Sequence, residues 1–316
     1  MPRVVVFGSS NTDMTVRVPR LPAPGQTILG SSFSTTPGGK GANQAVAARR
    51  AGAEVVFITA VGDDELGRQA LELYRREGID VTHVRVVEGV ASGVALIFVD
   101  DRGENLIGVA PGANHRLTPE DIDRLPASLF REDDVMLASL EIPLETASRA
   151  LKRGWDAGMY TMLNPAPAPA LSEAEVKDLF SGVIAITPNR VEALALAGMT
   201  QSEEGKPDWP ACGFRLKELG PAVVFITLGS RGCEVVDAKS CTVPAPRVDA
   251  VDTVGAGDAF NGALAVALTN KKLWRLSTAA AWANAAAALA VTQPGAQAAL
   301  PFREAIDRLA GQGKLD

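Results

Sequence analysis

Near the start of the chain, Val4-Val5-Val6-Phe7-Gly8-Ser9-Ser10-Asn11 is a short apolar run followed by small polar residues. A run of four apolar residues without alternation is typical of a strand that is buried on both faces of a parallel sheet. The next such run, residues 55–58, follows a helical pattern over residues 41–50 that Gly52 closes. This strand-helix-strand unit predicts a parallel sheet with helices on both faces.

The same alternation continues through most of the chain. Further buried strands are expected at residues 135–137, 160–163, 183–186 and 223–226, and further helices at residues 64–77, 144–157, 257–268, 273–291 and after Pro301. A Pro- and Gly-rich stretch and a hairpin pattern with a turn at residues 100–103 interrupt the alternation. We expect antiparallel lid segments at about residues 14–36 and 92–110, inserted into one doubly wound α/β domain that spans residues 1–316.

The composition argues against several classes of partner and site. Lys and Arg total 31 against 37 for Asp and Glu, a net charge of −6, so we expect neither nucleic-acid nor membrane binding. Cys212, Cys233 and Cys241 are an odd number in no C-x-x-C spacing, which argues against a disulfide framework or a zinc site. The first apolar run is too short for a secretory signal, and Asn284 interrupts the alanine-rich run at residues 282–291. We therefore expect a cytoplasmic protein.

The strongest local signal is Asp252-Thr253-Val254-Gly255-Ala256-Gly257-Asp258, directly before an apolar helical pattern. The two glycines let the backbone turn tightly, so that the amides of residues 256–258 can point together at an anion near the positive end of the helix. The stretch predicts a phosphate cradle that contains the carboxylate of Asp258. It is not a dinucleotide fingerprint, because Phe260 occupies the sixth position. The loop at residues 37–43 is not a Walker A loop, because Gly41 replaces Ser or Thr.

Four motifs, taken in order, resemble the signatures of the ribokinase-like (PfkB) carbohydrate kinases. They are residues 38–45 (Gly-Gly-Lys-Gly-Ala-Asn-Gln-Ala), 188–192 (Pro-Asn-Arg-Val-Glu), 227–232 (Thr-Leu-Gly-Ser-Arg-Gly) and 252–258. The resemblance extends from Val4 to Pro301. It implies an ATP-dependent kinase, with the 5-hydroxyl of D-ribose as the expected acceptor and a homodimer formed through the lid.

The resemblance assigns a role to each matched position. Asn11, Asp13, Gly39, Lys40, Asn43 and Glu141 would hold the sugar hydroxyls. Asp258 would be the general base, and the catalytic loop would also include Gly255, Ala256 and Gly257. The amides of Ala256, Gly257 and Asp258 would form the anion hole. ATP would be bound by Asn189, Thr227, Gly229, Ser230, Gly232, Gly257 and Asn284.

The resemblance also implies two cations. Asn189 and Glu192, three residues apart on one helix face, would order Mg²⁺ through its waters. K⁺ would be held by Asp252 and by the carbonyl groups of Val254, Ala290, Gln293 and Gly295. This sequence has Ala299 where serine is usual in the family, which removes one side-chain oxygen from the K⁺ site.

Plainer roles remain open for several of these residues. Asp258 could be a first-turn acid that interacts with the helix dipole, Lys40 a solvated loop lysine, and Glu141 a surface acid. Asn189 and Glu192 could be a helix cap and its first-turn acid. The nearest alternative function is the same chemistry on deoxyribose, fructose or a nucleoside, and another is sugar or nucleotide binding without catalysis. A nicotinamide oxidoreductase is disfavoured, because no G-x-G-x-x-G follows the first strand.

Overall fold

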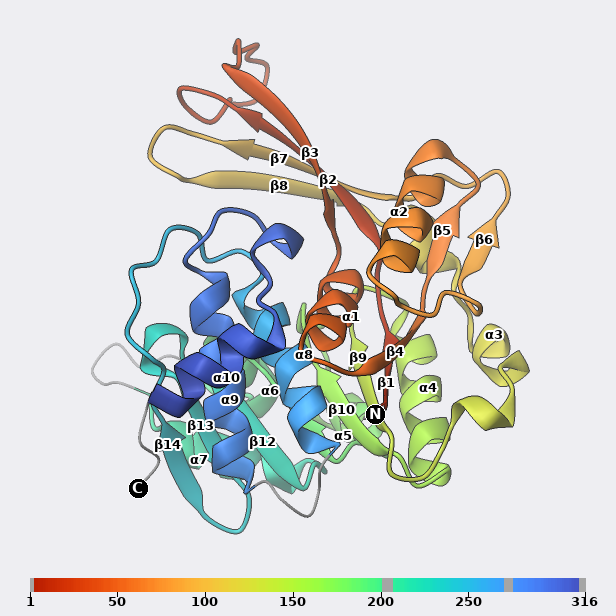
Figure 1. The fold of residues 1–316 in the computed structure, drawn as a ribbon, viewed down its shortest axis with the longest axis vertical. Helices are drawn as coiled ribbons and strands as arrows, with labels where there is room; N and C mark the ends of the chain where they lie inside the picture. Colours follow the sequence, from red (N-terminus) through yellow and green to blue (C-terminus); the bar gives the residue numbers. More distant parts are fainter. Residues whose placement is uncertain (1–2, 201–206, 270–274, 313–316) are drawn as a thin grey trace.

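An eight-stranded sheet forms the centre of the computed structural model, which describes residues 3–200, 207–269 and 275–312 (Figure 1). The strand order is β14-β13-β12-β11-β10-β9-β1-β4, and the neighbours from β12 to β4 are parallel. The strands are β1 (Arg3–Phe7), β4 (Glu54–Ile58), β9 (Val135–Ser139), β10 (Tyr160–Asn164), β11 (Ala185–Ile186), β12 (Val223–Thr227), β13 (Cys233–Val236) and β14 (Ser240–Val243). The expected α/β fold with a mostly parallel sheet is confirmed.

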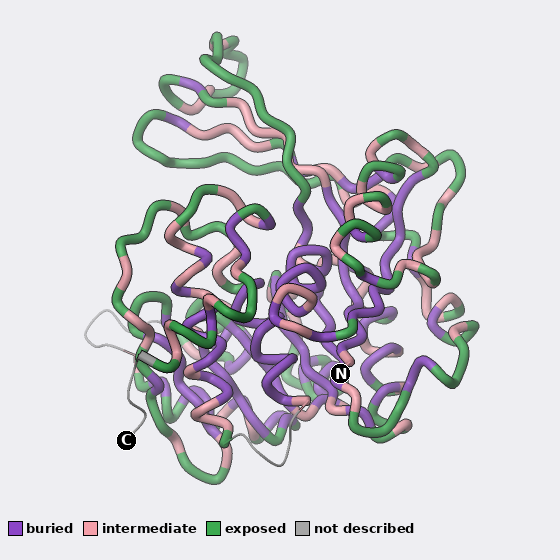
Figure 2. Tube along the Cα trace, in the orientation of Figure 1, coloured by how far each residue is buried: buried purple, intermediate pink, exposed green. Residues whose placement is uncertain are grey.

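Helices cover both faces of this sheet. They are α1 (Lys40–Arg50), α2 (Glu65–Arg76), α3 (Pro119–Arg124), α4 (Leu144–Asp156), α5 (Glu173–Leu179), α6 (Arg190–Ala197), α7 (Trp209–Glu218), α8 (Ala256–Leu268), α9 (Leu276–Ala290) and α10 (Arg303–Gln312). Val4 and Val6 pack into the apolar cluster that includes α1, α8 and α9, whereas Val5 and Phe7 pack into the cluster on the other face. Figure 2 shows this buried interior in purple. Each fully buried side chain of this size contributes about 1.5–3 kcal/mol, so both faces stabilise β1.

Three features of the main sheet and its helices differ from the sequence prediction. The antiparallel edge formed by β13 and β14 was not expected, because Glu234 interrupts the apolar run of β13, and Ser240 and Thr242 interrupt that of β14. The strand expected from Val183 begins only at Ala185. The helix expected from Leu273 begins at Leu276 among the described residues, and Leu273 itself lies outside them.

A second sheet projects from the main body, and its surface is largely exposed (Figures 1 and 2). Its strand order is β3 (Ser32–Gly38), β2 (Asn11–Arg17), β7 (Gly93–Val99) and β8 (Asn105–Ala110). The two outer pairs are antiparallel as predicted, but the central pair of β2 and β7 is parallel. Both hairpins leave the body along their first strand, so these two strands run in the same direction.

A two-stranded parallel sheet of β5 (Ala60–Gly62) and β6 (Arg85–Val87) lies next to α2. Cys212, Cys233 and Cys241 are all free thiols, as expected. Within the described ranges, no helix combines the length and the apolar character that a bilayer crossing needs.

Candidate functional site

The predicted phosphate cradle is an accessible helix start. α8 begins at Ala256, and Gly255 before it has the left-handed conformation (φ 79°) that L side chains rarely adopt. A Cβ atom added at Gly257 would meet nothing within 4 Å, so the space beside the first turn is open. The first-turn amides can therefore receive an anion from solvent.

Asp258 lies in this first turn and is held by two amide side chains from α1. Asn43 Nδ2 donates to Oδ2 of Asp258 at 2.8 Å, and Gln44 Nε2 donates to Oδ1 at 3.0 Å. Burial raises the pKa of Asp258, although the charge of Lys40 and the two amide donors oppose the rise. A buried carboxylate that is fixed through both oxygens suits a general base better than a solvated first-turn acid.

Glu141, in the loop after β9, is tied to the start of α1. Its Oε2 accepts hydrogen bonds from Ser9 Oγ and from Lys40 N, the latter at 3.0 Å, and its Oε1 lies 4.0 Å from Lys40 Nζ. Burial alone would lower the pKa of Lys40, but nearby carboxylates, Asp258 foremost, raise it above its ordinary value. Lys40 and Glu141 therefore belong to one cluster of charges, and neither is an isolated surface group.

Asp13, in β2, joins this cluster from the projecting sheet. Burial raises its pKa from 3.8 to about 6, and the charges of Glu141 and Asp258 add to the rise. A Cβ atom at Gly38 would lie 2.3 Å from both carboxylate oxygens of Asp13, so only glycine leaves room for this side chain. Among the hydrogen bonds of the described residues, none is donated to the Asp13 carboxylate. Such a carboxylate can accept hydrogen bonds from a ligand that carries several hydroxyl groups.

Asn11 and Gly39 complete the predicted sugar shell. Gly39 caps the start of α1, and a Cβ atom placed on it would lie 2.8 Å from Asn11 N. Asn11 Oδ1 accepts from Asn114 Nδ2 at 2.7 Å, and Asn114 Oδ1 accepts from Ser10 N at 2.8 Å. The sequence analysis gave Asn114 no role, because a single Asn in a Gly-rich turn carries no functional signal.

The glycine loop predicted to bind ATP follows β12. Thr227 ends β12, and Gly229 and Ser230 form the short helical turn after it, which Gly232 closes. Asn284 of α9 is buried, and its Nδ2 donates to Val243 O at 2.9 Å and to Pro244 O at 3.3 Å. The Asn284 donor is thus engaged with the loop after β14, whereas the sequence analysis expected it to line the nucleotide site.

Asn189 and Glu192 form a capping box at the start of α6. Asn189 Oδ1 accepts from the backbone N–H groups of Val191 at 2.9 Å and Glu192 at 3.0 Å, and Glu192 Oε2 accepts from Asn189 N at 2.8 Å. The plainer role of a helix cap is therefore present. Burial raises the pKa of Glu192, although the Asn189 hydrogen bond and Lys40 oppose the rise. One carboxylate and one amide also fit Mg²⁺, which keeps several waters and takes phosphate oxygens.

Of the residues predicted to hold K⁺, Asp252, Val254 and Gly295 are joined by hydrogen bonds, whereas Ala290 is the last residue of α9. Asp252 Oδ1 accepts from Val254 N at 3.0 Å, and Asp252 Oδ2 accepts from Gly295 N at 2.9 Å. Val251 N donates to Val291 O at 2.7 Å, which joins the loop to the end of α9. The described residues contain no cluster of three or more His, Cys, Asp or Glu side chains able to hold a metal ion. A cation here would take one carboxylate and backbone carbonyl oxygens, a donor set that fits a hard ion.

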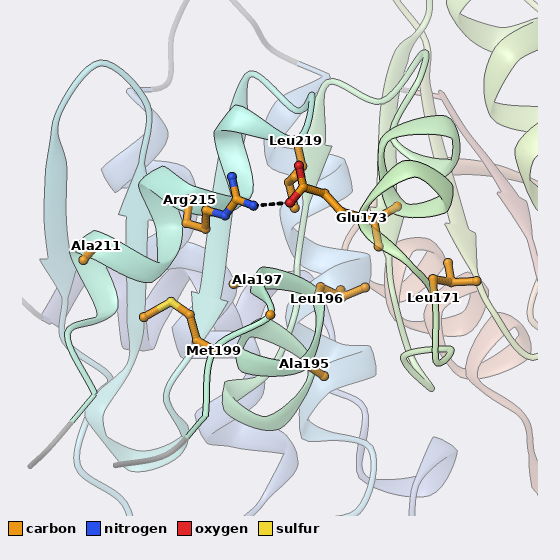
Figure 3. A pocket seen from close by; sticks show the side chains of 11 residues that line it. Leu171, Glu173, Ala195, Leu196, Ala197, Met199, Ala211, Arg215 and Leu219 are labelled. Carbon is orange, nitrogen blue, oxygen red and sulfur yellow. Dashed lines mark hydrogen bonds and ion pairs between the residues drawn. The ribbon is translucent and has the colours of Figure 1, made fainter. Parts of the chain in front are cut away.

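A separate pocket lies between α5, α6 and α7 (Figure 3). Arg215 and Glu173 form an ion pair across it, and most of its other lining residues are apolar. None of the predicted site residues lines this pocket. The polar groups that could do chemistry meet instead where β2, α1 and α8 approach one another.

The chain is similar to known proteins over most of its length. Residues 1–303 match the family described as pfkB family carbohydrate kinase. A ribokinase of Haemophilus influenzae is 39% identical over 302 residues, which cover 95% of this chain and 96% of that protein. The crystal structure of a ribokinase from Thermotoga maritima is 33% identical with a TM-score of 0.87, covering 98% of this chain and 100% of that one. A ribokinase of Arabidopsis thaliana, solved with ribose and ATP, is 28% identical with a TM-score of 0.82 and 98% coverage of both chains.

Proposed function

Because the chain belongs to the pfkB family of carbohydrate kinases, we propose that it transfers the γ-phosphoryl group of ATP to the 5-hydroxyl of D-ribose. The products are ribose 5-phosphate and ADP. The observation that carries the proposal is the buried Asp258 carboxylate, which two amides fix at an open helix N-terminus beside a shell of polar groups. The similarity to ribokinases supports ribose as the sugar.

The sugar is held by the shell that surrounds Asp258. Asn11, Asp13, Gly39, Lys40, Asn43 and Glu141 supply donors and acceptors for the hydroxyl groups of the sugar. Asp258 accepts the proton of the 5-hydroxyl as that oxygen forms its bond to the γ-phosphorus and the bond to ADP breaks. Burial raises the pKa of Asp258, and the charge of Lys40 opposes this rise and so favours the ionised form.

The phosphate groups lie against the start of α8. The amides of Ala256, Gly257 and Asp258 stabilise the negative charge that develops on the transferred group, and Gly255 allows the turn before them. Thr227, Gly229, Ser230 and Gly232 support the rest of the nucleotide together with Asn189, and Asn284 holds the neighbouring loop.

Two cations assist this arrangement. Asn189 and Glu192 would order Mg²⁺ through water, and the ion would supply positive charge for the phosphate groups of ATP. Asp252 and the carbonyl groups of Val254, Ala290, Gln293 and Gly295 would hold K⁺, which would supply positive charge beside the loop that presents the first-turn amides.

We further propose that the chain is one domain whose projecting sheet, β2, β3, β7 and β8, acts as a lid and as a dimer contact. Asp13 lies on the face of this sheet that belongs to the site. The strand registers place Phe33, Leu96 and Leu106 on the opposite face, and all three are exposed. Exposed apolar residues that share a face favour pairing with a second copy. Unpaired thiols support a reducing cytoplasmic location.

A charged residue introduced on the face of the projecting sheet opposite Asp13 tests whether this face forms a dimer contact. We expect Leu96→Lys to convert a dimer to a monomer in light scattering, whereas Glu104→Lys in the exposed turn keeps the dimer. An unchanged mass for Leu96→Lys would contradict the lid contact.

The substrate is tested by measuring ADP release with D-ribose, 2-deoxyribose, fructose and adenosine at several concentrations. We expect the highest kcat/KM for D-ribose. A higher kcat/KM for 2-deoxyribose, fructose or adenosine would identify that compound, and not ribose, as the preferred substrate. No ADP release above background with any of them would favour a binding protein without catalysis.

A further inference from the structure

A chain of buried polar side chains lies behind Asp258, away from the shell that would hold the sugar. It consists of Gln44 in α1, Asn164 at the end of β10, Thr187 after β11, and Asn261 in α8. All four side chains are at least nine-tenths buried. Four buried polar groups are costly unless they are hydrogen-bonded, so their arrangement requires a physical reason.

Hydrogen bonds join these side chains into a closed circuit. Gln44 Nε2 donates to Asp258 Oδ1 and to Asn164 Oδ1, both at 3.0 Å. Asn164 Nδ2 donates to Thr187 O at 3.0 Å, and the Thr187 hydroxyl donates to Asn261 Oδ1. Asn261 Nδ2 then donates to Gly257 O at 2.8 Å. Because Gly257 precedes Asp258, the circuit begins at the carboxylate and returns to the backbone beside it.

The two backbone carbonyls in the circuit fix the direction of every amide. A carbonyl can only accept, so the NH₂ group of Asn164 must face Thr187 O, and its Oδ1 must face Gln44. Gln44 must then turn its NH₂ group toward Asn164 and Asp258. Its Oε1 has no hydrogen-bond partner, yet the reversed amide would place this oxygen against two acceptors. The circuit therefore always presents a donor to Asp258.

We propose that Gln44, oriented by Asn164, is a positioning residue that fixes the plane of the Asp258 carboxylate and keeps it ionised for proton transfer, while Thr187 and Asn261 fix the backbone beside Asp258 through Gly257 O. This inference rests on the role of Asp258 in the proposed function. Asn43 holds the second oxygen, and two of about four lone-pair sites of the carboxylate are then used. The remaining sites are left for the sugar hydroxyl.

The ionisable groups around Asp258 are Lys40, Glu141 and Asp13. Lys40 favours the ionised carboxylate, and the two acids oppose it. None of these groups belongs to the circuit, so variants of the circuit leave them in place. A change in the pH dependence of kcat in such variants reports the lost donor, because hydrogen bonds to the charged form favour that form.

Two substitutions and one matched control test the inference with the full-length enzyme. Gln44→Met keeps the side-chain length and removes the donor. Thr187→Val removes only a hydroxyl that does not contact Asp258. Thr161→Val is the control, because Thr161 is equally buried and its hydroxyl donates to Gly182 O at 2.7 Å, outside the circuit.

For Gln44→Met we expect kcat to fall about 10-fold to 100-fold, the scale of one hydrogen bond to a charged group, with KM for the sugar little changed. The acidic limb of its kcat profile should move to higher pH. Thr187→Val leaves the Gln44 donor in place but frees Asn261, so kcat should fall about 3-fold to 10-fold while the acidic limb stays where it is in the wild type. Thr161→Val should lower thermal stability without moving the pH profile.

The inference is overturned if Thr187→Val folds and keeps the wild-type kcat, even if Gln44→Met does not fold. It is also overturned if Gln44→Met folds and keeps the wild-type pH profile, or if Thr161→Val lowers kcat as far as Thr187→Val does. An active wild-type enzyme with unaffected variants contradicts only this inference, whereas a wild-type protein without kinase activity contradicts the proposed function.

Discussion

Asp13 should make the free protein less stable than a neutral residue would at the same position. Its carboxylate is largely buried, and it accepts no hydrogen bond from the described residues. Burial and two neighbouring acids raise its pKa from 3.8 to about 6. At about 1.4 kcal/mol per pKa unit, this rise corresponds to about 3 kcal/mol. Because Asp13 retains some exposure, we expect Asp13→Asn to increase the free energy of unfolding by about 1–3 kcal/mol at pH 8.

The sign of this effect follows from the two pKa values. A carboxyl group with a raised pKa in the folded state stabilises the protein fully below pH 3.8, where it is protonated in both states. This contribution is lost as the pH rises through about 6. The advantage of Asp13→Asn should therefore be largest at pH 8, fall to about half near pH 5, and nearly vanish below pH 3.8. The variant should also bind the sugar more weakly, because the ligand loses a charged acceptor.

Urea denaturation of the free protein at pH 8, 6 and 5 measures this effect. Asp101→Asn, in the exposed turn between β7 and β8, is the matched control and should change stability little at any of these pH values. The reasoning is refuted if Asp13→Asn is no more stable than wild type at pH 8, or if its advantage does not depend on pH. An advantage of this kind would mean that Asp13 is kept for binding at a cost in stability.

Three further substitutions test other parts of the site. Asp258→Asn should keep the fold and ATP affinity but lower kcat by about 10²-fold to 10⁴-fold, and near-normal turnover would exclude Asp258 as the base. Gly38→Ala places a Cβ atom 2.3 Å from the Asp13 oxygens and should raise KM for the sugar, whereas Gly108→Ala, which meets nothing within 4 Å, should not. If Gly38→Ala and Gly108→Ala changed KM for the sugar equally in steady-state kinetics, this result would contradict the predicted clash between residue 38 and Asp13. Ala299→Ser should lower the K⁺ concentration for half-activation, and an identical activation curve would show that residue 299 does not face the ion.

The parallel part of the fold could be predicted from the sequence because its signals are local. Four-residue apolar runs such as Val4–Phe7 have few alternatives to a doubly buried strand, and a glycine such as Gly52 fixes where a helix ends. The direction in which β2 and β7 pair could not be read in this way. It depends on where two hairpins, about eighty residues apart in the chain, leave the body. The edge strands β13 and β14 were missed because Glu234 interrupts the apolar run of β13, and Ser240 and Thr242 interrupt that of β14.

The residues of the candidate site also fall into two groups: those that local motifs identify and those that they do not. Residues within motifs, such as Lys40 and Asp258, could be assigned from the resemblance, and the structure brings them into one charged cluster. Asn114 and Asn164 could not be assigned, because their importance arises from contacts between segments distant in sequence. Asn284 remains a predicted nucleotide-site residue, and its donor also binds two backbone carbonyls that the sequence does not reveal as neighbours.

The most direct test of the account is to identify where the phosphate is placed on the sugar. The enzyme is incubated with D-ribose, ATP and Mg²⁺, and the product is analysed by phosphorus-detected NMR. We predict a phosphate ester coupled to the two protons of C5, because the fixed carboxylate of Asp258 lies beside the open first turn of α8. A phosphate on another carbon, or inorganic phosphate without a sugar ester, would contradict the assignment of this site to phosphoryl transfer at the 5-hydroxyl.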